Sequence, residues 1–181
     1  RETLGAAAAR IRAVIANSGC ANACTGERGM HDAREMASLA ARALGVAPEQ
    51  VLVLSTGVIG VPLDMAKLAL GIPPLGAAIA AVAGSSAARA PGPGVAATAA
   101  AAARAIMTTD THPKIASQDL ALGRGTIALR GIAKGAGMIH PNMATMLSVI
   151  TTDAALAPAP LARALAAAAD RSFNRVSVDG D

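Results

Sequence analysis

Two kinds of apolar pattern alternate along the chain. Five segments form short apolar runs or alternate apolar with polar residues, as strands do: residues 11–16, 51–54, 126–132, 145–151 and 176–178. Three segments have apolar residues at helical spacing: residues 31–44, 63–70 and 160–171. Gly45 follows the first helix, where a left-handed residue commonly ends one. Because strands and helices interleave, the pattern predicts an α/β (α+β) fold.

Turn-forming residues follow the first two predicted strands. Residues 17–26, N-S-G-C-A-N-A-C-T-G, are rich in Asn, Ser and Gly, so we expect a loop there. Ser55-Thr56-Gly57 comes directly after residues 51–54, an unbroken apolar run typical of a strand buried on both faces. We therefore expect this triplet at the end of a buried strand.

Residues 76–104 are of low complexity and rich in alanine. The sequence A-P-G-P-G at 90–94 divides this stretch, so it predicts two helical pieces around a loop. We interpret it as an insertion within a single domain over residues 1–181. The longest uncharged run, residues 68–88, has the length of a membrane span, but Pro73-Pro74 and Ser85-Ser86 argue against one. We expect no membrane association.

Composition predicts a thin core. Hydrophobic residues make up 53% of the 181, but half of them are alanine, and Phe173 is the sole aromatic residue. Because small side chains bury little apolar area, we expect further polypeptide to complete this core. The chain starts at Arg1 rather than Met and stops at Gly180-Asp181, so we expect an incomplete domain.

Charge and cysteine usage exclude several function classes. The net charge is +4, but the arginines are scattered, without the basic stripe and stacking aromatics of nucleic-acid binding. Cys20 and Cys24 stand as C-x₃-C, which is neither a redox C-x-x-C nor a complete zinc motif, so we interpret them as two small buried residues. Reduced thiols and the absence of a signal peptide favour a cytoplasmic protein.

Several common kinds of catalytic site have no signature here. The histidines, His31, His112 and His140, are far apart and in no metal-binding motif, so we expect no metal. Lys134 precedes its glycines, the reverse of a P-loop, and G-x-S-x-G is missing. The remaining candidate is catalysis in which a threonine hydroxyl acts as the nucleophile.

Residues 134–147, K-G-A-G-M-I-H-P-N-M-A-T-M-L, place Thr145 after a small residue and a Pro-Asn bend. If the bond between Ala144 and Thr145 is cut, the new α-amine, with a pKa of about 7.7–8.0, is a base for the Thr145 hydroxyl at neutral pH. Thr56 and Gly57 are candidate donors to an oxyanion. Each of these assignments has an ordinary structural alternative. Thr145 can be one of the many threonines found in buried strands, and Thr56-Gly57 can be part of a common turn.

A resemblance to one family favours the functional interpretation of these residues over the ordinary structural one. Residues 134–147, followed by V-I-T-T-D-A-A-L, closely resemble the self-cleavage region of the ornithine acetyltransferase / glutamate N-acetyltransferase family. Three more segments resemble the same family in the same order: residues 17–26, V-L-S-T-G-V-I-G at 53–60 and I-M-T-T-D-T-H-P-K at 106–114. The four blocks span most of the chain. The resemblance implies the sandwich of sheets and helices found in that family and in related N-terminal-nucleophile aminopeptidases.

The resemblance also implies roles for particular residues. Cleavage falls between Ala144 and Thr145, and Thr145 becomes the nucleophile. The oxyanion hole falls on Thr56 and Gly57, and the substrate contacts in this part of the family fall on Thr108, Lys134 and Thr145. No role is carried over for Asn17, Gly19 or Asn22.

The implied reaction moves an acetyl group from N²-acetylornithine to glutamate through acetyl-Thr145, in arginine biosynthesis. No cofactor is implied, although some members also use acetyl-CoA as a substrate. The C-terminal part of the family, which supplies further substrate contacts, is missing here. The resemblance implies that it belongs to a second subunit, in a heterotetramer of two α and two β chains. Two alternatives stay open: a related self-cleaving aminopeptidase or amidohydrolase, in which water accepts the acyl group, and an inert truncated segment.

Overall fold

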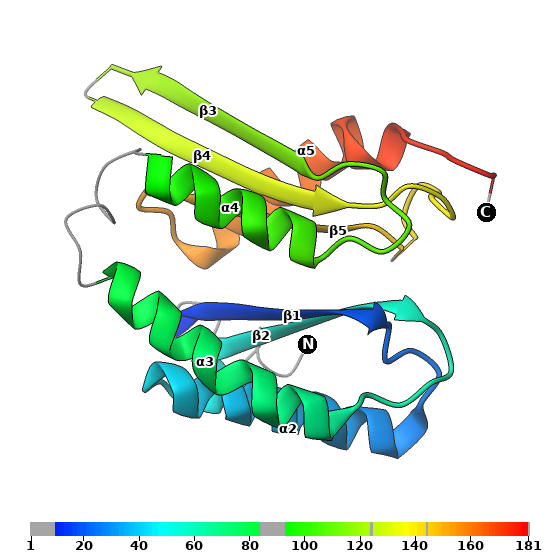
Figure 1. Cartoon of the computed structure of the whole chain (residues 1–181). Coiled ribbons are helices and arrows are strands. Elements are labelled where there is room, and N and C mark those ends of the chain that lie inside the picture. Colours follow the sequence, from blue (N-terminus) through cyan, green and yellow to red (C-terminus); the bar gives the residue numbers. More distant parts are fainter. Residues whose placement is uncertain (1–9, 84–92, 124, 144, 181) are drawn as a thin grey trace. The chain divides into compact units, whose positions relative to one another are not determined.

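The computed structural model describes residues 10–83, 93–123, 125–143 and 145–180 (Figure 1). The chain divides into two compact units, Arg1–Thr98 and Ala99–Asp181. The dividing point lies inside helix α4 (Pro93–Ala105). Unit 1 contains a parallel pair of strands, and unit 2 contains an antiparallel sheet of three strands.

The strands of unit 1 are longer than the sequence predicts. β1 (Ala13–Cys20) pairs in parallel with β2 (Val51–Val58), in a register that runs from Ala13 opposite Val51 to Gly19 opposite Gly57. The expected loop at 17–20 and the expected strand end at residue 54 are therefore wrong. Pairing satisfies the backbone N–H and C=O groups of these residues, and this outweighs the turn preference of Asn, Ser and Gly.

Helix α2 (Gly26–Leu44) begins five residues before the predicted start and ends where predicted. Gly45 has φ +67°, and its N–H donates to the carbonyl of Ala41. The Val46 N–H also donates to Ala41, at 3.1 Å, so two donors close the end of the helix. A 3₁₀ turn, η2 (Pro48–Gln50), then leads into β2.

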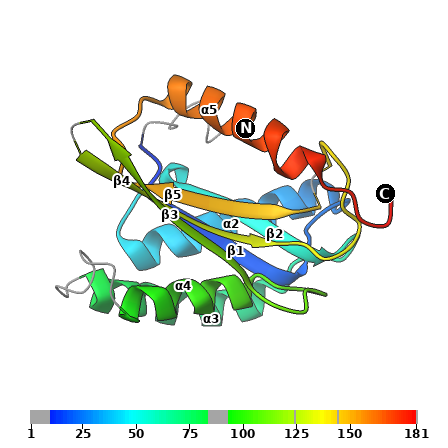
Figure 2. The same ribbon diagram turned by 90° about the horizontal axis from the view of Figure 1, so that it is seen from above.

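Helix α3 (Met65–Ala83) is much longer than the predicted segment 63–70. It continues through Pro73 and Pro74, which lack the N–H groups that would bond to the preceding turn. Ile72, beside the prolines, is only 3% exposed, so packing in the core holds the helix together here. α2 and α3 lie on the same side of the β1–β2 pair (Figures 1 and 2).

The core of unit 1 is small, as composition predicts. Its buried residues are Met36, Ala40, Ala41, Val51, Leu63 and Ile72. Two of the six are alanines, and Met36 is the large side chain among the described residues that is fully buried. Burying each of the four larger side chains, Met36, Val51, Leu63 and Ile72, contributes about 1.5–3 kcal/mol, so these four provide most of what this core contributes.

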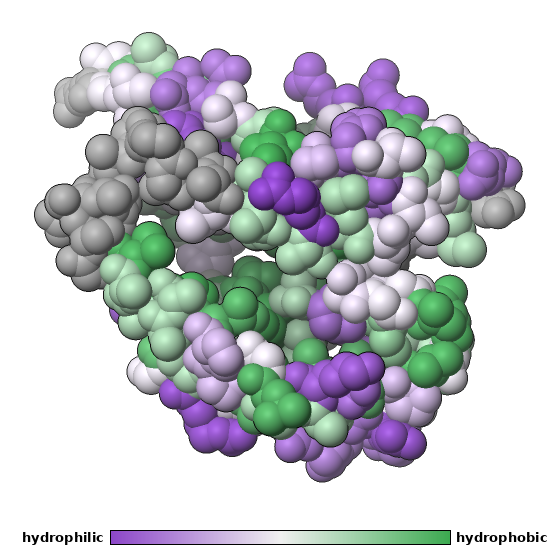
Figure 3. Space-filling view, viewed as in Figure 1, coloured by the Kyte–Doolittle hydropathy of each residue, from purple (hydrophilic) through white to green (hydrophobic). Residues whose placement is uncertain are grey.

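One helix among the described residues, α3, is long and apolar enough to cross a membrane. Over Met65–Val82 its mean hydropathy is 1.6, and 11% of that stretch is buried. Core helices of soluble proteins pass the same test, and α3 contributes Ile72 to the core of unit 1. The helix also carries four exposed apolar residues, Leu70, Leu75, Ile79 and Val82. Apolar surface is visible in green in the region of α3 in Figure 3.

The sheet of unit 2 has the strand order β3–β4–β5, all antiparallel. β4 (Gly125–Lys134) matches the predicted strand, and β5 (Leu147–Thr152) starts two residues after Thr145. β3 (Lys114–Leu122) is not predicted, because its residues are almost all exposed and give little apolar signal. Residues 99–105 of α4 and helix α5 (Pro158–Arg171) lie on opposite sides of this sheet (Figures 1 and 2).

Two further expectations concern the alanine-rich stretch 76–104 and residues 176–178. Within the alanine-rich stretch, residues 76–83 form the end of α3 and residues 93–104 lie in α4, so both predicted helical pieces are present. Of the loop expected at 90–94, residues 93 and 94 lie in α4 and the rest lies outside the described residues. The strand expected at 176–178 is wrong. After the 3₁₀ turn η4 (Phe173–Arg175), Val178 instead forms a single bridge with Ile139.

Candidate functional site

Two of the expected substrate contacts touch each other in unit 2. Lys134 is the last residue of β4 and is 6% exposed. Its Nζ donates a hydrogen bond of 2.8 Å to Thr108 Oγ1. Thr108 lies in the segment between α4 and β3, 26 residues earlier in the chain. A buried ammonium beside a hydroxyl is a suitable partner for a carboxylate.

A buried carboxylate, which the sequence reasoning missed, holds this pair in place. The side chain of Asp110 is 1% exposed. Its Oδ1 accepts hydrogen bonds from Lys114 Nζ at 2.6 Å and from the Gly135 N–H at 2.7 Å. Its Oδ2 accepts from the Thr108 N–H at 3.3 Å. Asp110 thus fixes the backbone of Thr108 and of the residue that follows Lys134.

The surroundings of Asp110 keep it ionised. Burial, the largest influence on its pKa, opposes ionisation. The hydrogen bonds from Lys114, Gly135 and Thr108 act in the other direction and together lower the pKa of Asp110 from 3.8 to about 2. The carboxylate therefore stays negative at neutral pH. The signal in the sequence was T-T-D followed by a lysine four residues after the aspartate, in a loop that leads into a strand.

Thr145 precedes β5 at the same end of the sheet. Lys134, at the end of β4, pairs with Leu147, at the start of β5. A Cβ added to Gly135 would lie 3.3 Å from Met146 Cγ, so the two chain segments stay close beyond the last strand pair. The end of β4, the start of β5 and the Thr108–Asp110 loop therefore meet at one end of unit 2. Ala144 lies outside the described residues.

The hydroxyl of Thr145 has an unusual environment. Its Oγ1 is buried and has no hydrogen-bond partner among the described residues. Leaving a buried polar atom unpaired costs about 1–3 kcal/mol, so such groups in native proteins call for an explanation. A hydroxyl that must be available for attack is one explanation, since no existing bond has to break before it reacts.

Thr56 and Gly57 lie in unit 1, near the end of β2. Thr56 is 7% exposed. Gly57 has φ +133°, and a Cβ there would lie 2.3 Å from the Gly19 carbonyl carbon and 2.6 Å from the Cys20 nitrogen. Only glycine fits this approach between β1 and β2. The strand register also shifts at Cys20, and irregularities of this kind are common next to active sites.

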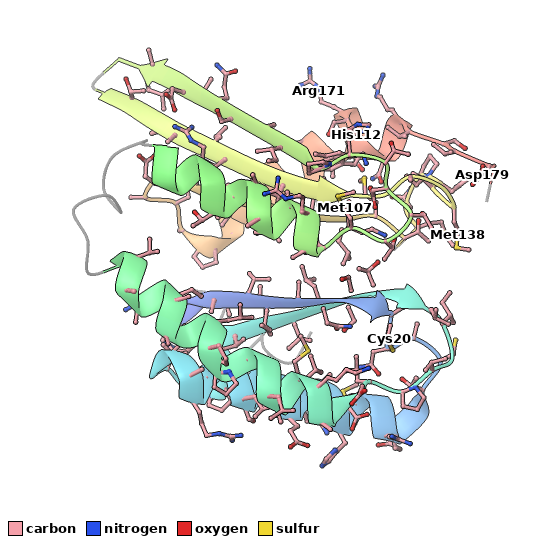
Figure 4. The ribbon with its side chains drawn as sticks, viewed as in Figure 1. Cys20, Met107, His112, Met138, Arg171 and Asp179 are labelled. Carbon is pink, nitrogen blue, oxygen red and sulfur yellow. The ribbon has the colours of Figure 1, made fainter. Side chains whose placement is uncertain are left out.

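Polar side chains hold both the end of β1 and the loop between β1 and α2. Asn17 Nδ2 donates to the Cys20 carbonyl at 2.8 Å, and Asn22 Nδ2 donates to the Gly29 carbonyl at 2.8 Å. Both cysteines are free thiols, but Cys24 is exposed, so the expectation that both are buried is wrong. Cys20, labelled in Figure 4, is half-buried at the end of β1. Within the described residues, no three His, Cys, Asp or Glu side chains gather as metal ligands.

The comparisons with known proteins agree on one family. A model of the ArgJ family matches residues 1–181. The arginine biosynthesis bifunctional protein ArgJ of Symbiobacterium thermophilum is 54% identical over 171 residues, and that of Geobacter sulfurreducens is 51% identical over 170. Each alignment covers 94% of this chain and 39% of the relative, so the chain spans about 39% of the length of these relatives.

Two solved structures are similar to this fold. The crystal structure of ArgJ from Bacillus halodurans gives a TM-score of 0.62 at 35% identity, over 79% of this chain and 66% of that one. The ornithine acetyltransferase of Mycobacterium tuberculosis, solved in complex with ornithine, gives 0.57 at 34% identity, over 79% and 67%.

Proposed function

The chain belongs to the ArgJ family, and on this premise we propose that it carries the nucleophile of a self-cleaving acetyltransferase of arginine biosynthesis. In this proposal an acetyl group passes from N²-acetylornithine to glutamate through Thr145. The names of the relatives support the reaction class, since one is an ornithine acetyltransferase bound to ornithine. The observation that carries the assignment is the buried, unpartnered Thr145 hydroxyl at the same sheet end as Lys134 and Thr108.

Self-cleavage makes the nucleophile. Thr145 Oγ attacks the carbonyl carbon of Ala144, the C–N bond breaks, and the hydroxyl proton passes to the nitrogen. The product is an ester between residue 144 and the Thr145 side chain. Water hydrolyses this ester, which leaves a carboxylate on residue 144 and restores the hydroxyl of Thr145, now beside its own free α-amine. That amine is a base of suitable pKa at neutral pH.

Acetyl transfer then takes two steps. The α-amine accepts the Thr145 hydroxyl proton while Oγ attacks the acetyl carbonyl of N²-acetylornithine, and the departing ornithine amine takes up that proton. The uncharged amine of glutamate next attacks acetyl-Thr145, which forms N-acetylglutamate and returns the proton to Oγ. Thr56 and Gly57 donate to the oxyanion of each tetrahedral intermediate. Lys134 pairs with a substrate carboxylate, and Thr108 orients Lys134.

The proposal also covers the substrates, the subunits and the cellular location of the enzyme. The substrates are small molecules, no cofactor is required, and acetyl-CoA is a possible second acetyl donor. The two cleavage products form a heterotetramer of two α and two β chains in the cytoplasm, without nucleic acid or membrane. The remaining length of the family supplies the substrate contacts that this chain lacks.

Trapping the acetylated enzyme tests the proposal. The full-length gene product is mixed with N²-acetylornithine in the absence of glutamate, quenched in acid and digested. The peptide that begins at Thr145 is expected to be one acetyl group heavier, and glutamate added before the quench is expected to remove that group. Thr145→Ala should show no acetyl group, whereas Thr145→Ser, which keeps a hydroxyl, should retain some. Acetyl transfer by Thr145→Ala at the normal rate would overturn the proposal.

A further inference from the structure

The segment ahead of Thr145 is tied to residues well beyond it in the chain. The Asn142 N–H donates to Asn174 Oδ1 at 3.1 Å, and Asn174 Nδ2 donates back to Asn142 Oδ1 at 3.1 Å. Asn174 Nδ2 also donates to Asp170 Oδ1 at 2.8 Å. The one amide group of Asn174 thus makes three hydrogen bonds, with its own position fixed by the end of α5.

These bonds act on a residue with a demanding backbone conformation. Asn142 has φ +60°, in the left-handed region that most non-glycine residues avoid. The turn around it closes with a bond of 3.1 Å from the Met143 N–H to the His140 carbonyl. Asn142 stands two residues before the proposed cleavage bond. Its conformation therefore sets the direction in which the chain leaves the turn, ahead of that bond.

A second, independent tie lies next to this one. Ile139 and Val178 exchange backbone hydrogen bonds of 3.1 and 2.7 Å. The Met138 N–H donates to Asp179 Oδ2 at 3.0 Å, and Figure 4 shows both residues beyond the end of β4. Because this tie holds the start of the loop without Asn174, losing the Asn174 side chain should release the bend at Asn142 and leave the loop attached.

We propose that Asn174 is a positioning residue for self-cleavage: it holds Asn142 in the left-handed bend of the loop that leads to the bond Thr145 is proposed to attack. This inference rests on the function proposed above. Intramolecular attack depends steeply on the alignment of the reacting atoms, and small misplacements cost up to about 10²-fold in rate. After cleavage the bend at Asn142 is no longer needed for acetyl transfer. Asn174 therefore affects the rate of self-cleavage and not the kcat of acetyl transfer.

The test follows cleavage from its start. Full-length protein is made by cell-free translation with a radiolabel, and the uncut fraction is measured on gels over time. Asn174→Ala is expected to slow cleavage about tenfold or more. Once fully cut, it should transfer acetyl groups at the wild-type kcat. Ser172→Ala is the matched control, since Ser172 lies at the same end of α5 and its hydroxyl donates to the Ala168 carbonyl at 2.6 Å, within the helix and away from Asn142. It should cleave at the wild-type rate.

Rescue separates positioning from a loss of structure. Glycine adopts positive φ without help, so Asn142→Gly combined with Asn174→Ala is expected to cleave several times faster than Asn174→Ala alone. If Asn174→Ala does not fold, Asn174→Asp takes its place, because it keeps the acceptor for the Asn142 N–H and loses both donors. Slower cleavage is again expected.

The outcomes distinguish this inference from the proposed function. A wild-type protein that stays uncut overturns both. A wild-type protein that is cut, with Asn174→Ala or Asn174→Asp cut equally fast, overturns the role of Asn174 alone. Equal losses of cleavage rate and of kcat in the cut enzyme, without rescue by Asn142→Gly, would likewise assign Asn174 a purely structural role.

Discussion

Replacing Asp110 with asparagine tests the buried network beneath the candidate site. Asparagine has the same shape, and its Oδ1 still accepts hydrogen bonds from Lys114 and Gly135. It carries no charge, however, and its Nδ2 faces the N–H of Thr108, so two donors oppose each other. We expect Asp110→Asn to destabilise unit 2 at neutral pH.

The pKa of Asp110 sets the size of this effect. The difference between 3.8 and about 2, at about 1.36 kcal/mol per pKa unit, corresponds to about 2 kcal/mol. Because the folded-state pKa is the lower one, this stability is present above the unfolded pKa and is lost as pH falls through the folded pKa. It should be nearly complete at pH 4, about half remains at pH 3, and little is left at pH 2.

Urea unfolding followed by circular dichroism measures the difference, since the chain has no Trp or Tyr to report by fluorescence. The free energy of unfolding of Asp110→Asn is subtracted from that of the wild type at each pH. Asp119→Asn is the matched control: Asp119 pairs with Arg130 at 2.7 Å but is 58% exposed, so a change below about 0.5 kcal/mol is expected. A difference for Asp110→Asn that stays constant from pH 7 to pH 2 would refute the reasoning.

Three further substitutions test other parts of the account. Lys134→Met should raise KM for the carboxylate-bearing substrates at least tenfold, while Lys67→Met, at an exposed lysine, should leave KM unchanged in the same steady-state assay. Gly57→Ala should cost about 2 kcal/mol or more in urea unfolding, because its Cβ would clash with the β1 backbone, whereas Gly123→Ala has open space and should cost little. Met36→Ala should cost about 2–5 kcal/mol, seen as a lower Tm by circular dichroism, and an unchanged Tm would contradict the core described for unit 1.

Local signals in the sequence predicted local structure well. Gly45 ends α2 because the positive φ required at a helix end is a property of that one residue. The end of β1 was misjudged because residues 17–20 prefer turns locally, and only pairing with β2 makes them a strand. α3 passes through Pro73 and Pro74 for a similar reason, since burial of the adjoining Ile72 offsets the lost hydrogen bonds.

In the candidate site, too, contacts between residues distant in the sequence could not be predicted from local patterns. Thr108 and Lys134 were identified by resemblance, but their contact spans 26 residues, and no local pattern predicts it. Asp110 was missed because its burial and its bond to Gly135 arise only when the two chain segments meet. Asn174 was missed for the same reason, since its partner Asn142 lies 32 residues away.

The most direct test of the central claim is to determine the N-termini of the chains in an active, full-length preparation. The account predicts two, one of them starting T-M-L-S-V at Thr145. A fully active enzyme in which the bond between Ala144 and Thr145 is intact would contradict it.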